Sequence, residues 1–397
     1  MFLLNLCTMK SYILLCSLLF ASVIGVYGQV IFSPPTNYFA VNDPRDVCTA
    51  DFNNDGKMDM AICGINNQLI IMLGTGTGVF SLPNSIPLNT YITFCNSILS
   101  ADFNSDGNMD IAVCGGVIKV LLGNGNGTFG TSVTYTSLGW INDFCVGDFN
   151  LDGKMDMAAC IEALGGFGNP GNITLFLGNG SGSFTAGSLY PVGADPVSII
   201  CNDFNVDGNL DIVTGNQTSG SLSVYYGNGS GGLNFISNVT TGTYYPEELV
   251  SDDFNQDGLF DVASIDGAGD VQIFLMNIVT GFTAYTTYST GMSGPVWCVT
   301  KGDFDFDGNA DLATVSQNGF NGELSIISGN GLGAFSFPSL FTFNNVIDPW
   351  NLAIGDFNAD NKDDIVIVNY SSSDYTIFLN QNCASTFQYS DTICAGD

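Results

Sequence analysis

The chain has no histidine and few basic residues. Its 397 residues include 7 Lys and Arg against 38 Asp and Glu, which gives a formal net charge of -31. The absence of His excludes Ser-His-Asp and Cys-His catalysis and His-ligated zinc or haem. Seven scattered cations cannot form the basic face that nucleic-acid binding requires, so we expect no nucleic-acid partner.

Charged residues are also scarce, at 11% of the chain, whereas hydrophobic residues make up 45%. A chain this apolar can build a core, unlike a disordered acidic protein. Its apolar runs are short, rich in β-forming residues and separated by many of the 49 glycines, with no helical periodicity. This pattern of runs therefore predicts an all-β protein.

Residues 1–28 have the features of a secretory signal peptide. A positive start at Met9-Lys10 precedes a mostly apolar run from Ser11 to Val26, and Val26-Tyr27-Gly28 suits cleavage before Gln29. The alternative is an uncleaved anchor helix; no other stretch is long and apolar enough to span a membrane. We expect a secreted, extracellular protein with no membrane span after cleavage, and seven Asn-Xaa-Ser/Thr sequons available for glycosylation in a eukaryote.

Seven similar nonapeptides recur along the chain, here numbered as loops one to seven. They begin at Asp51, Asp102, Asp148, Asp203, Asp253, Asp303 and Asp356 and follow Asp-Phe-Asn-x-Asp-Gly-x-x-Asp with small departures. Their successive spacings are 51, 46, 55, 50, 50 and 53 residues. Short alternating runs flank each loop, and an apolar run with a Gly-rich hairpin follows. Each repeat therefore predicts a four-stranded antiparallel unit, the blade of a propeller.

The two ends of the chain predict how the ring closes. The last repeat stops after its third strand, Tyr375 to Leu379, and Val30-Ile31-Phe32 resembles the segments after the hairpins at Phe129, Phe184 and Phe335. We expect residues 29–40 to supply the missing fourth strand, which protects the open edges. The predicted fold is an all-β, seven-bladed β-propeller of four-stranded antiparallel blades at 29–382, between the signal peptide at 1–28 and a Cys-containing tail at 383–397.

The repeated nonapeptide has the chemistry of a calcium loop. Oxygens at positions one, three and five converge if the chain coils tightly, and Gly at position six permits a left-handed turn. Position seven then offers its carbonyl, and Asp at position nine returns a carboxylate, which completes the hard oxygen cage that Ca²⁺ prefers. No loop has the Glu at position twelve that an EF-hand needs. The alternative is a set of Asx-rich turns without an ion, but carboxylates so close together repel each other without a cation.

We predict five ligands in each loop, for up to seven Ca²⁺ ions. They are Asp51, Asn53, Asp55, Lys57, Asp59, Asp102, Asn104, Asp106, Asn108, Asp110, Asp148, Asn150, Asp152, Lys154, Asp156, Asp203, Asn205, Asp207, Asn209, Asp211, Asp253, Asn255, Asp257, Leu259, Asp261, Asp303, Asp305, Asp307, Asn309, Asp311, Asp356, Asn358, Asp360, Lys362 and Asp364. Loop six has Asp305 where the others have Asn, and loop seven has Asn361 in place of Gly. We interpret the Phe at position two as a core anchor.

The repeats resemble those of FG-GAP and VCBS repeat proteins, whose best-known relative is the integrin alpha-subunit propeller. The resemblance rests on the seven Asp-rich loops and covers nearly the whole mature chain. It implies that each loop joins the first and second strands of a blade and holds Ca²⁺ on the lower face. Some secreted fungal lectins look like the same design and bind sugars. We expect no integrin receptor role, because the chain shows no leg, transmembrane or cytoplasmic region.

All three Trp fall on the segments that enter first strands, at the opposite face from the loops. Trp140, Trp297 and Trp350 lie six to eight residues before a loop, and exposed Trp is a common platform for sugar rings or protein contacts. The alternative is that each Trp packs between blades. The longest upper loop, from Glu162 to Asn172, is the other candidate for ligand binding.

These features predict a secreted calcium-binding propeller, lectin-like or adhesive, whose partner is an extracellular glycan or protein. The alternatives are a polysaccharide lyase or hydrolase and a structural matrix or filament subunit. We expect no enzyme activity, because the acids outside the loops form no paired motif. The sequence leaves the oligomeric state open.

Ten of the twelve cysteines remain after signal cleavage, an even number in an oxidising compartment. Loops one and three are flanked by cysteines at matching offsets, which makes cross-strand disulfides plausible. The candidate pairs are Cys48 with Cys63, Cys145 with Cys160, the looser analogue Cys95 with Cys114, and Cys383 with Cys394 in the tail. Cys201 and Cys298 have no assigned partner.

Overall fold

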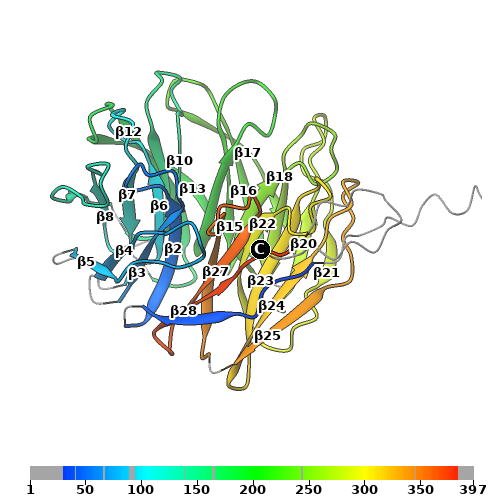
Figure 1. Ribbon diagram of the computed structural model, residues 1–397. Coiled ribbons are helices and arrows are strands. Elements are labelled where there is room, and N and C mark those ends of the chain that lie inside the picture. The colour runs from blue at the N-terminus through cyan, green and yellow to red at the C-terminus, as the bar shows by residue number, and fades with distance from the viewer. Residues whose placement is uncertain are drawn as a thin grey trace, which may run out of the picture.

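The computed structural model describes residues 30–40, 42–65, 68–88, 94–137, 139–162, 166–242, 245–344 and 346–382. These residues form seven four-stranded antiparallel sheets, arranged as the blades of a ring (Figure 1). The predicted seven-bladed β-propeller is therefore confirmed. The signal peptide and the Cys-containing tail lie outside the described residues. Within the described ranges, no helix has the length and apolar character needed to cross a membrane.

In blades one to six the strands pair in chain order, and the first strand of every blade lines the axis of the ring. Blade one contains β2 (Pro44–Ala50), β3 (Asp59–Gly64), β4 (Gln68–Met72) and β5 (Asn84–Pro87). Blade two contains β6 (Ser97–Ala101), β7 (Asp110–Cys114), β8 (Ile118–Leu121) and β9 (Val133–Tyr135). Blade three contains β10 (Trp140–Gly147), β11 (Asp156–Glu162), β12 (Pro170–Gly178) and β13 (Phe184–Ala194). Blade four contains β14 (Pro196–Asn202), β15 (Asp211–Asn216), β16 (Ser221–Gly227) and β17 (Leu233–Thr240). Blade five contains β18 (Pro246–Asp252), β19 (Asp261–Asp266), β20 (Asp270–Phe274) and β21 (Thr286–Ser289). Blade six contains β22 (Val296–Gly302), β23 (Asp311–Asn318), β24 (Asn321–Ile327) and β25 (Ser339–Asn344). Blade seven contains β26 (Pro349–Gly355), β27 (Asp364–Asn369), β28 (Asp374–Phe378) and the N-terminal β1 (Thr36–Phe39).

The N-terminal strand closes the ring, as predicted. β1 pairs antiparallel with β28, with Tyr38 opposite Tyr375, so the blue end of the chain joins its red end (Figure 1). Phe32 bridges Asn380 just as Phe129 bridges Gly123 in blade two. The Phe32 ring also lies 5.2 to 6.4 Å, centroid to centroid, from three rings of blades six and seven, which are those of Phe304, Phe341 and Phe378.

Second strands form the centre of each blade's packing. β3 and β27 are buried at every residue, because a neighbouring blade covers each face. Their sequences are therefore continuous apolar runs rather than alternating ones. The Phe at loop position two is buried in all seven blades, which confirms its role as a core anchor: Phe52, Phe103, Phe149, Phe204, Phe254, Phe304 and Phe357.

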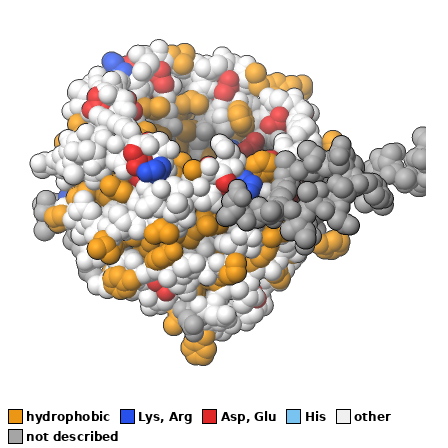
Figure 2. Space-filling model, viewed as in Figure 1, with side chains coloured by type: hydrophobic (Ala, Val, Ile, Leu, Met, Phe, Trp, Pro, Cys, Tyr) orange, Lys and Arg blue, Asp and Glu red, His pale blue; other side chains and the backbone are white. Residues whose placement is uncertain are grey.

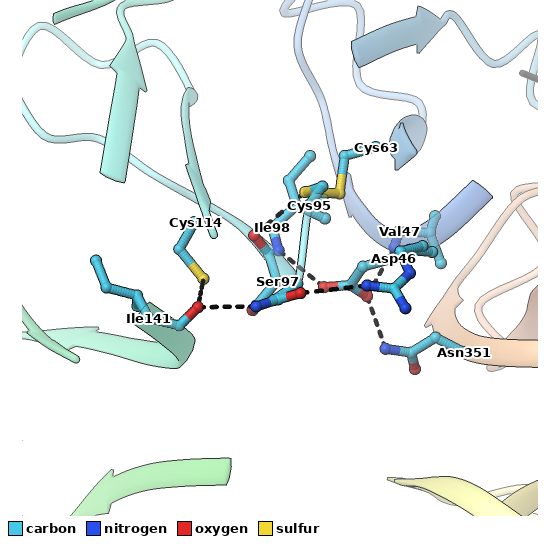
Figure 3. The surroundings of a disulfide bond; sticks show 11 residues. Asp46, Val47, Cys63, Cys95, Ser97, Ile98, Cys114, Ile141 and Asn351 are labelled. Atoms are coloured by element: carbon cyan, nitrogen blue, oxygen red, sulfur yellow. Dashed lines mark hydrogen bonds between the residues drawn. A yellow bond between two sulfur atoms is a disulfide. The ribbon is translucent and has the colours of Figure 1, made fainter. Parts of the chain in front are cut away.

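The described cysteines form one disulfide, between Cys63 and Cys95, whose Cα atoms are 6.0 Å apart (Figure 3). It joins β3 of blade one to the segment before β6 of blade two. The predicted pairs of Cys63 with Cys48 and of Cys95 with Cys114 are therefore wrong. The register explains the first error, because Cys48 lies opposite Ala61, two residues before Cys63 along β3.

The same two-residue offset separates the cysteines of blade three. Cys145 lies opposite Ala158, and Cys160 lies opposite Asp143. The predicted pair of Cys145 with Cys160 is therefore also wrong, and both residues are free thiols, as are Cys48 and Cys114. Cys383 and Cys394 fall outside the described residues.

The role of the N-terminal segment in closing the ring can be tested by substituting two of its phenylalanines. We expect Phe32→Ala to lower the free energy of unfolding by about 3 kcal/mol, because it removes a ring packed against three others. Phe39→Ala, at a side chain that is 70% exposed, should change it by less than about 0.5 kcal/mol. Urea denaturation of both variants measures the difference, and equal effects would contradict the role of Phe32 in closure.

Candidate metal loops and the channel mouth

Each predicted metal loop joins the first strand of its blade to the second and is coiled by its own side chains. In loop one, Asp51 accepts backbone N–H bonds from Asp55 at 3.1 Å and Gly56 at 2.7 Å. Asn53 accepts from the Asp55 N–H at 2.9 Å, and Asp55 accepts from the Lys57 N–H at 3.0 Å. The four corresponding bonds are present in loop six, between Asp303 and Asn309. The side chains at positions one, three and five thus hold the loop in the tight coil that the sequence predicted.

Two left-handed backbone positions make this coil possible. Gly56 at position six has a φ of 80°, and Asn361 adopts 62° in loop seven, as its place in the pattern predicted. Position four is also left-handed in every loop, although none of its residues is glycine; the sequence did not reveal this. These residues are Asn54, Ser105, Leu151, Val206, Gln256, Phe306 and Ala359.

Asp at position nine has a structural role that the sequence analysis missed. In blade one the buried Asp59 accepts the N–H of Phe52 at 2.9 Å with one oxygen and the N–H of Gly74, beyond β4, at 2.7 Å with the other. Asp261 of blade five makes the same pair of bonds, to Phe254 and Met276. This carboxylate therefore ties the loop to the exit of the third strand. The clue in the sequence is that position nine is Asp in all seven loops, since an amide would leave one N–H without an acceptor.

Loop six gathers three carboxylates. One oxygen each from Asp303, Asp305 and Asp311 lies within 4.8 Å of the others, and no other group of acids or cysteines among the described residues does the same. Asp305 and Asp311 are buried. Burial and then the charge of Asp305 raise the pKa of Asp311 to about 8. Three hard oxygen donors that repel each other fit a cation such as Ca²⁺, so this triad can hold a metal ion.

Three other loops carry a lysine beside the carboxylates. Lys57, Lys154 and Lys362, at position seven, place their ammonium groups 3.1, 3.1 and 2.8 Å from the position-five carboxylate. In loops one and three both partners are about a third exposed or more, so these ion pairs add little stability. The backbone carbonyl of position seven, the predicted ligand, does not depend on the side chain.

A channel of about 850 Å³ runs along the axis of the ring and is lined by the first strands. Figure 2 shows a hollow near the centre of the face in view, with hydrophobic side chains around it. Trp297 and Trp350 line this channel, and their rings stack with centroids 6.2 Å apart and planes 21° apart. The two tryptophans therefore form a continuous aromatic surface at its mouth.

The third tryptophan joins this surface through two other side chains. The Trp140 ring lies 6.5 Å from the Phe94 ring. The Arg45 guanidinium lies 5.3 Å from the Phe94 ring, 5.1 Å from Trp350 and 5.7 Å from Tyr370. We call these six residues, Arg45, Phe94, Trp140, Trp297, Trp350 and Tyr370, the aromatic arc. Trp140 is 37% and Trp297 42% exposed, so neither is enclosed between blades.

Buried acids link neighbouring blades inside the channel. Asp46, Asp143 and Glu248 each accept a backbone N–H from the next blade, at 2.8, 3.0 and 3.1 Å. Asp46 also accepts from the Val47 N–H and the Asn351 amide (Figure 3). Burial raises the pKa of all three, that of Asp46 to about 7.

Comparison with known proteins supports the repeat assignment. The family described as FG-GAP-like repeat matches residues 29–113 and 253–314. No curated protein matches the chain. The chain is similar to one in the crystal structure of BBS1N in complex with ARL6DN soaked with lead, with a TM-score of 0.62 and 14% identity over 88% of this chain and 97% of that one. A mercury-soaked crystal of the same complex gives a TM-score of 0.63 and 16% identity over 90% and 99%.

At such low identity these structures establish the fold alone, and they agree with the ring described above. The protein is therefore a β-propeller of the repeat class. More specifically, it forms a seven-bladed ring, two stretches of which match the FG-GAP-like repeat family.

The two roles of the loop acids can be separated in loop five. In EDTA we expect Asp261→Asn to lower the free energy of unfolding by about 1–3 kcal/mol, because one buried N–H loses its acceptor. Asp257→Asn, at the exposed position five, should leave stability in EDTA nearly unchanged and reduce the gain produced by calcium. Urea denaturation with and without calcium measures both variants. Equal losses in EDTA would contradict the structural role of position nine.

The raised pKa values predict how the metal-free protein responds to pH. The pKa is raised to about 6 for Asp59 and Asp110 and to about 7 for Asp211, Asp261 and Asp364, chiefly by burial. The folded state therefore binds more protons than the unfolded state between these pKa values and the ordinary one, and the stability that these groups contribute is lost as pH rises from about 4 through about 6 to 7. In EDTA the melting midpoint should fall between pH 5.5 and pH 8.5; a midpoint that rises over this range would contradict the assignment.

Proposed function

We propose that this protein is a secreted, calcium-stabilised binding module whose ligand, an extracellular glycan, binds the aromatic arc at the mouth of the axial channel. The observation that carries the proposal is the stacked pair Trp297 and Trp350, which faces the channel instead of the core. Aromatic faces bind the apolar faces of sugar rings, and polar groups beside them hold the hydroxyls. Asn96, Glu247 and Asn351 line the same channel and provide such groups.

Calcium in this proposal holds the opposite, loop-bearing side of the blades. The donors are the oxygens at positions one, three, five, seven and nine of each loop, and the acidic triad of loop six is the strongest support. When bound, the ion would neutralise carboxylates that otherwise repel each other. Ions that bind only the folded state stabilise it.

Secretion is supported by two features of the chain and by the calcium of the extracellular compartment. Residues 1–28 have the composition of a signal peptide. The disulfide between Cys63 and Cys95 is of the kind that persists in oxidising compartments. An extracellular module would also meet calcium at the millimolar level at which such sites commonly bind, with a Kd of roughly 10⁻⁴–10⁻³ M.

A protein ligand is the second candidate. The support comes from the structures similar in fold, which are described as BBS1N in complex with another protein, ARL6DN. Clustered Trp, Tyr and Arg are also the residue types that dominate protein–protein hot spots. Both ligands would use the aromatic arc, so one set of variants tests either.

The test is a glycan array in calcium, followed by capture of extracellular proteins. We expect Trp297→Ala and Trp350→Ala each to weaken glycan binding at least tenfold with little change in the melting midpoint. Phe337→Ala removes a side chain that is 96% exposed and outside the aromatic arc, and should bind as the unaltered protein does. Unchanged binding in both Trp variants would contradict the proposed site. Binding to protein alone would favour the second candidate, and cleavage of a polysaccharide would favour an enzyme.

A further inference from the structure

Two free cysteines face each other across the boundary between blades three and four. Cys145 lies on β10 and Cys201 on β14, which are the first strands of these blades. Both line the axial channel, and both belong to one cluster of packed apolar side chains. The Cys201 thiol donates to the carbonyl of Val146, the residue next to Cys145, at 3.4 Å. Burial, and then the neighbouring Cys201 side chain, raises the pKa of the Cys145 thiol.

The register of the repeats explains why these two side chains meet. Cys145 stands three residues before its loop, and Cys201 stands two residues before the next one. Successive side chains of a strand point to opposite faces, so one cysteine points toward blade four and the other toward blade three. The corresponding pair between blades one and two is Cys48 and Ser100, which line the same channel and interact closely enough for Ser100 to lower the pKa of the Cys48 thiol against the larger effect of burial. The contact is therefore a regular position of the fold, and only blades three and four fill it with two cysteines.

We propose that Cys145 and Cys201 form a second interblade disulfide, which links blades three and four as Cys63 and Cys95 link blades one and two. Cys201 is partly exposed to the channel, whereas Cys145 is buried, so Cys201 is the thiol that an oxidant reaches first. The oxidant is a disulfide such as glutathione disulfide. The Cys201 thiolate attacks it, forms a mixed disulfide and releases one thiol. The Cys145 thiolate then attacks the Cys201 sulfur, closes the protein disulfide and releases the second thiol.

Neighbouring cysteines do not offer an equivalent partner. Cys160 lies on the same sheet as Cys145, but its thiol donates to the carbonyl of Pro196 at 3.7 Å. Cys114 occupies the equivalent position in blade two and donates to the carbonyl of Ile141 at 3.9 Å. In blade one this position is Cys63, which meets Cys95 (Figure 3). Cys63, Cys114 and Cys160 thus each contact a residue other than Cys145 or Cys201 across the blade boundary.

The test is a peptide map of the full-length protein after incubation with glutathione disulfide. Free thiols are alkylated, the protein is denatured without reduction, and cleavage before Asp releases Cys145 in residues 143–147 and Cys201 in residues 195–202. We expect these two peptides to be recovered joined. Recovery of both as alkylated thiols, or of Cys145 joined to Cys160, would overturn the proposal.

Three variants sharpen the result. Cys201→Ser should abolish the joined peptide and leave Cys145 alkylated, whereas the matched control Cys114→Ser should retain it. Ser100→Cys should create a new link to Cys48, because it places a second cysteine at the corresponding boundary. A joined peptide that persists in Cys201→Ser would contradict the pairing, and a Ser100→Cys protein that folds without forming the new link would contradict the register argument.

Discussion

A buried carboxylate at the ninth loop position is the interaction on which each blade depends. Its two oxygens accept backbone N–H groups from two parts of the blade that are distant in sequence, the loop at Phe52 and the strand exit at Gly74 in blade one. Burying a carboxylate costs free energy, and the other loop acids beside it repel it. The blade therefore also needs a positive charge near these acids. Calcium would satisfy that requirement, so the geometry of the blade and the proposed metal belong to the same constraint.

The blades are joined to each other by backbone contacts that recur around the ring. Gly127 of the blade-two hairpin donates to the Phe52 carbonyl of blade one at 2.9 Å, and Gly78 of blade one donates to Phe357 of blade seven at 2.8 Å. Inside the channel, Asp46 and Asp143 add side-chain links between blades. The rigid first strands then hold the aromatic arc in place, which is how a repeat built around its loops produces a binding surface at the opposite end of the channel.

Much of this architecture could be predicted, because it repeats. The number of loops predicted the number of blades, and the similarity of the segment at Phe32 to that at Phe129 predicted the closing strand. The disulfide could not be predicted correctly, since matching cysteine offsets in two repeats do not reveal the strand register: the loop places Ala50 opposite Asp59, so Cys48 lies opposite Ala61 and not Cys63. The left-handed backbone at Val206 was also hidden, because valine rarely adopts it and only the fold enforces it.

The most direct test of the calcium sites is the number of ions that the protein binds. Native mass spectrometry of the EDTA-stripped protein, titrated with calcium, should show stepwise uptake of several ions, up to seven, with loop six among the occupied sites. Thermal melting of the same samples should show a midpoint that rises with calcium, because the ions bind the folded state. No uptake and an unchanged midpoint would contradict the central claim that these carboxylate loops are metal sites.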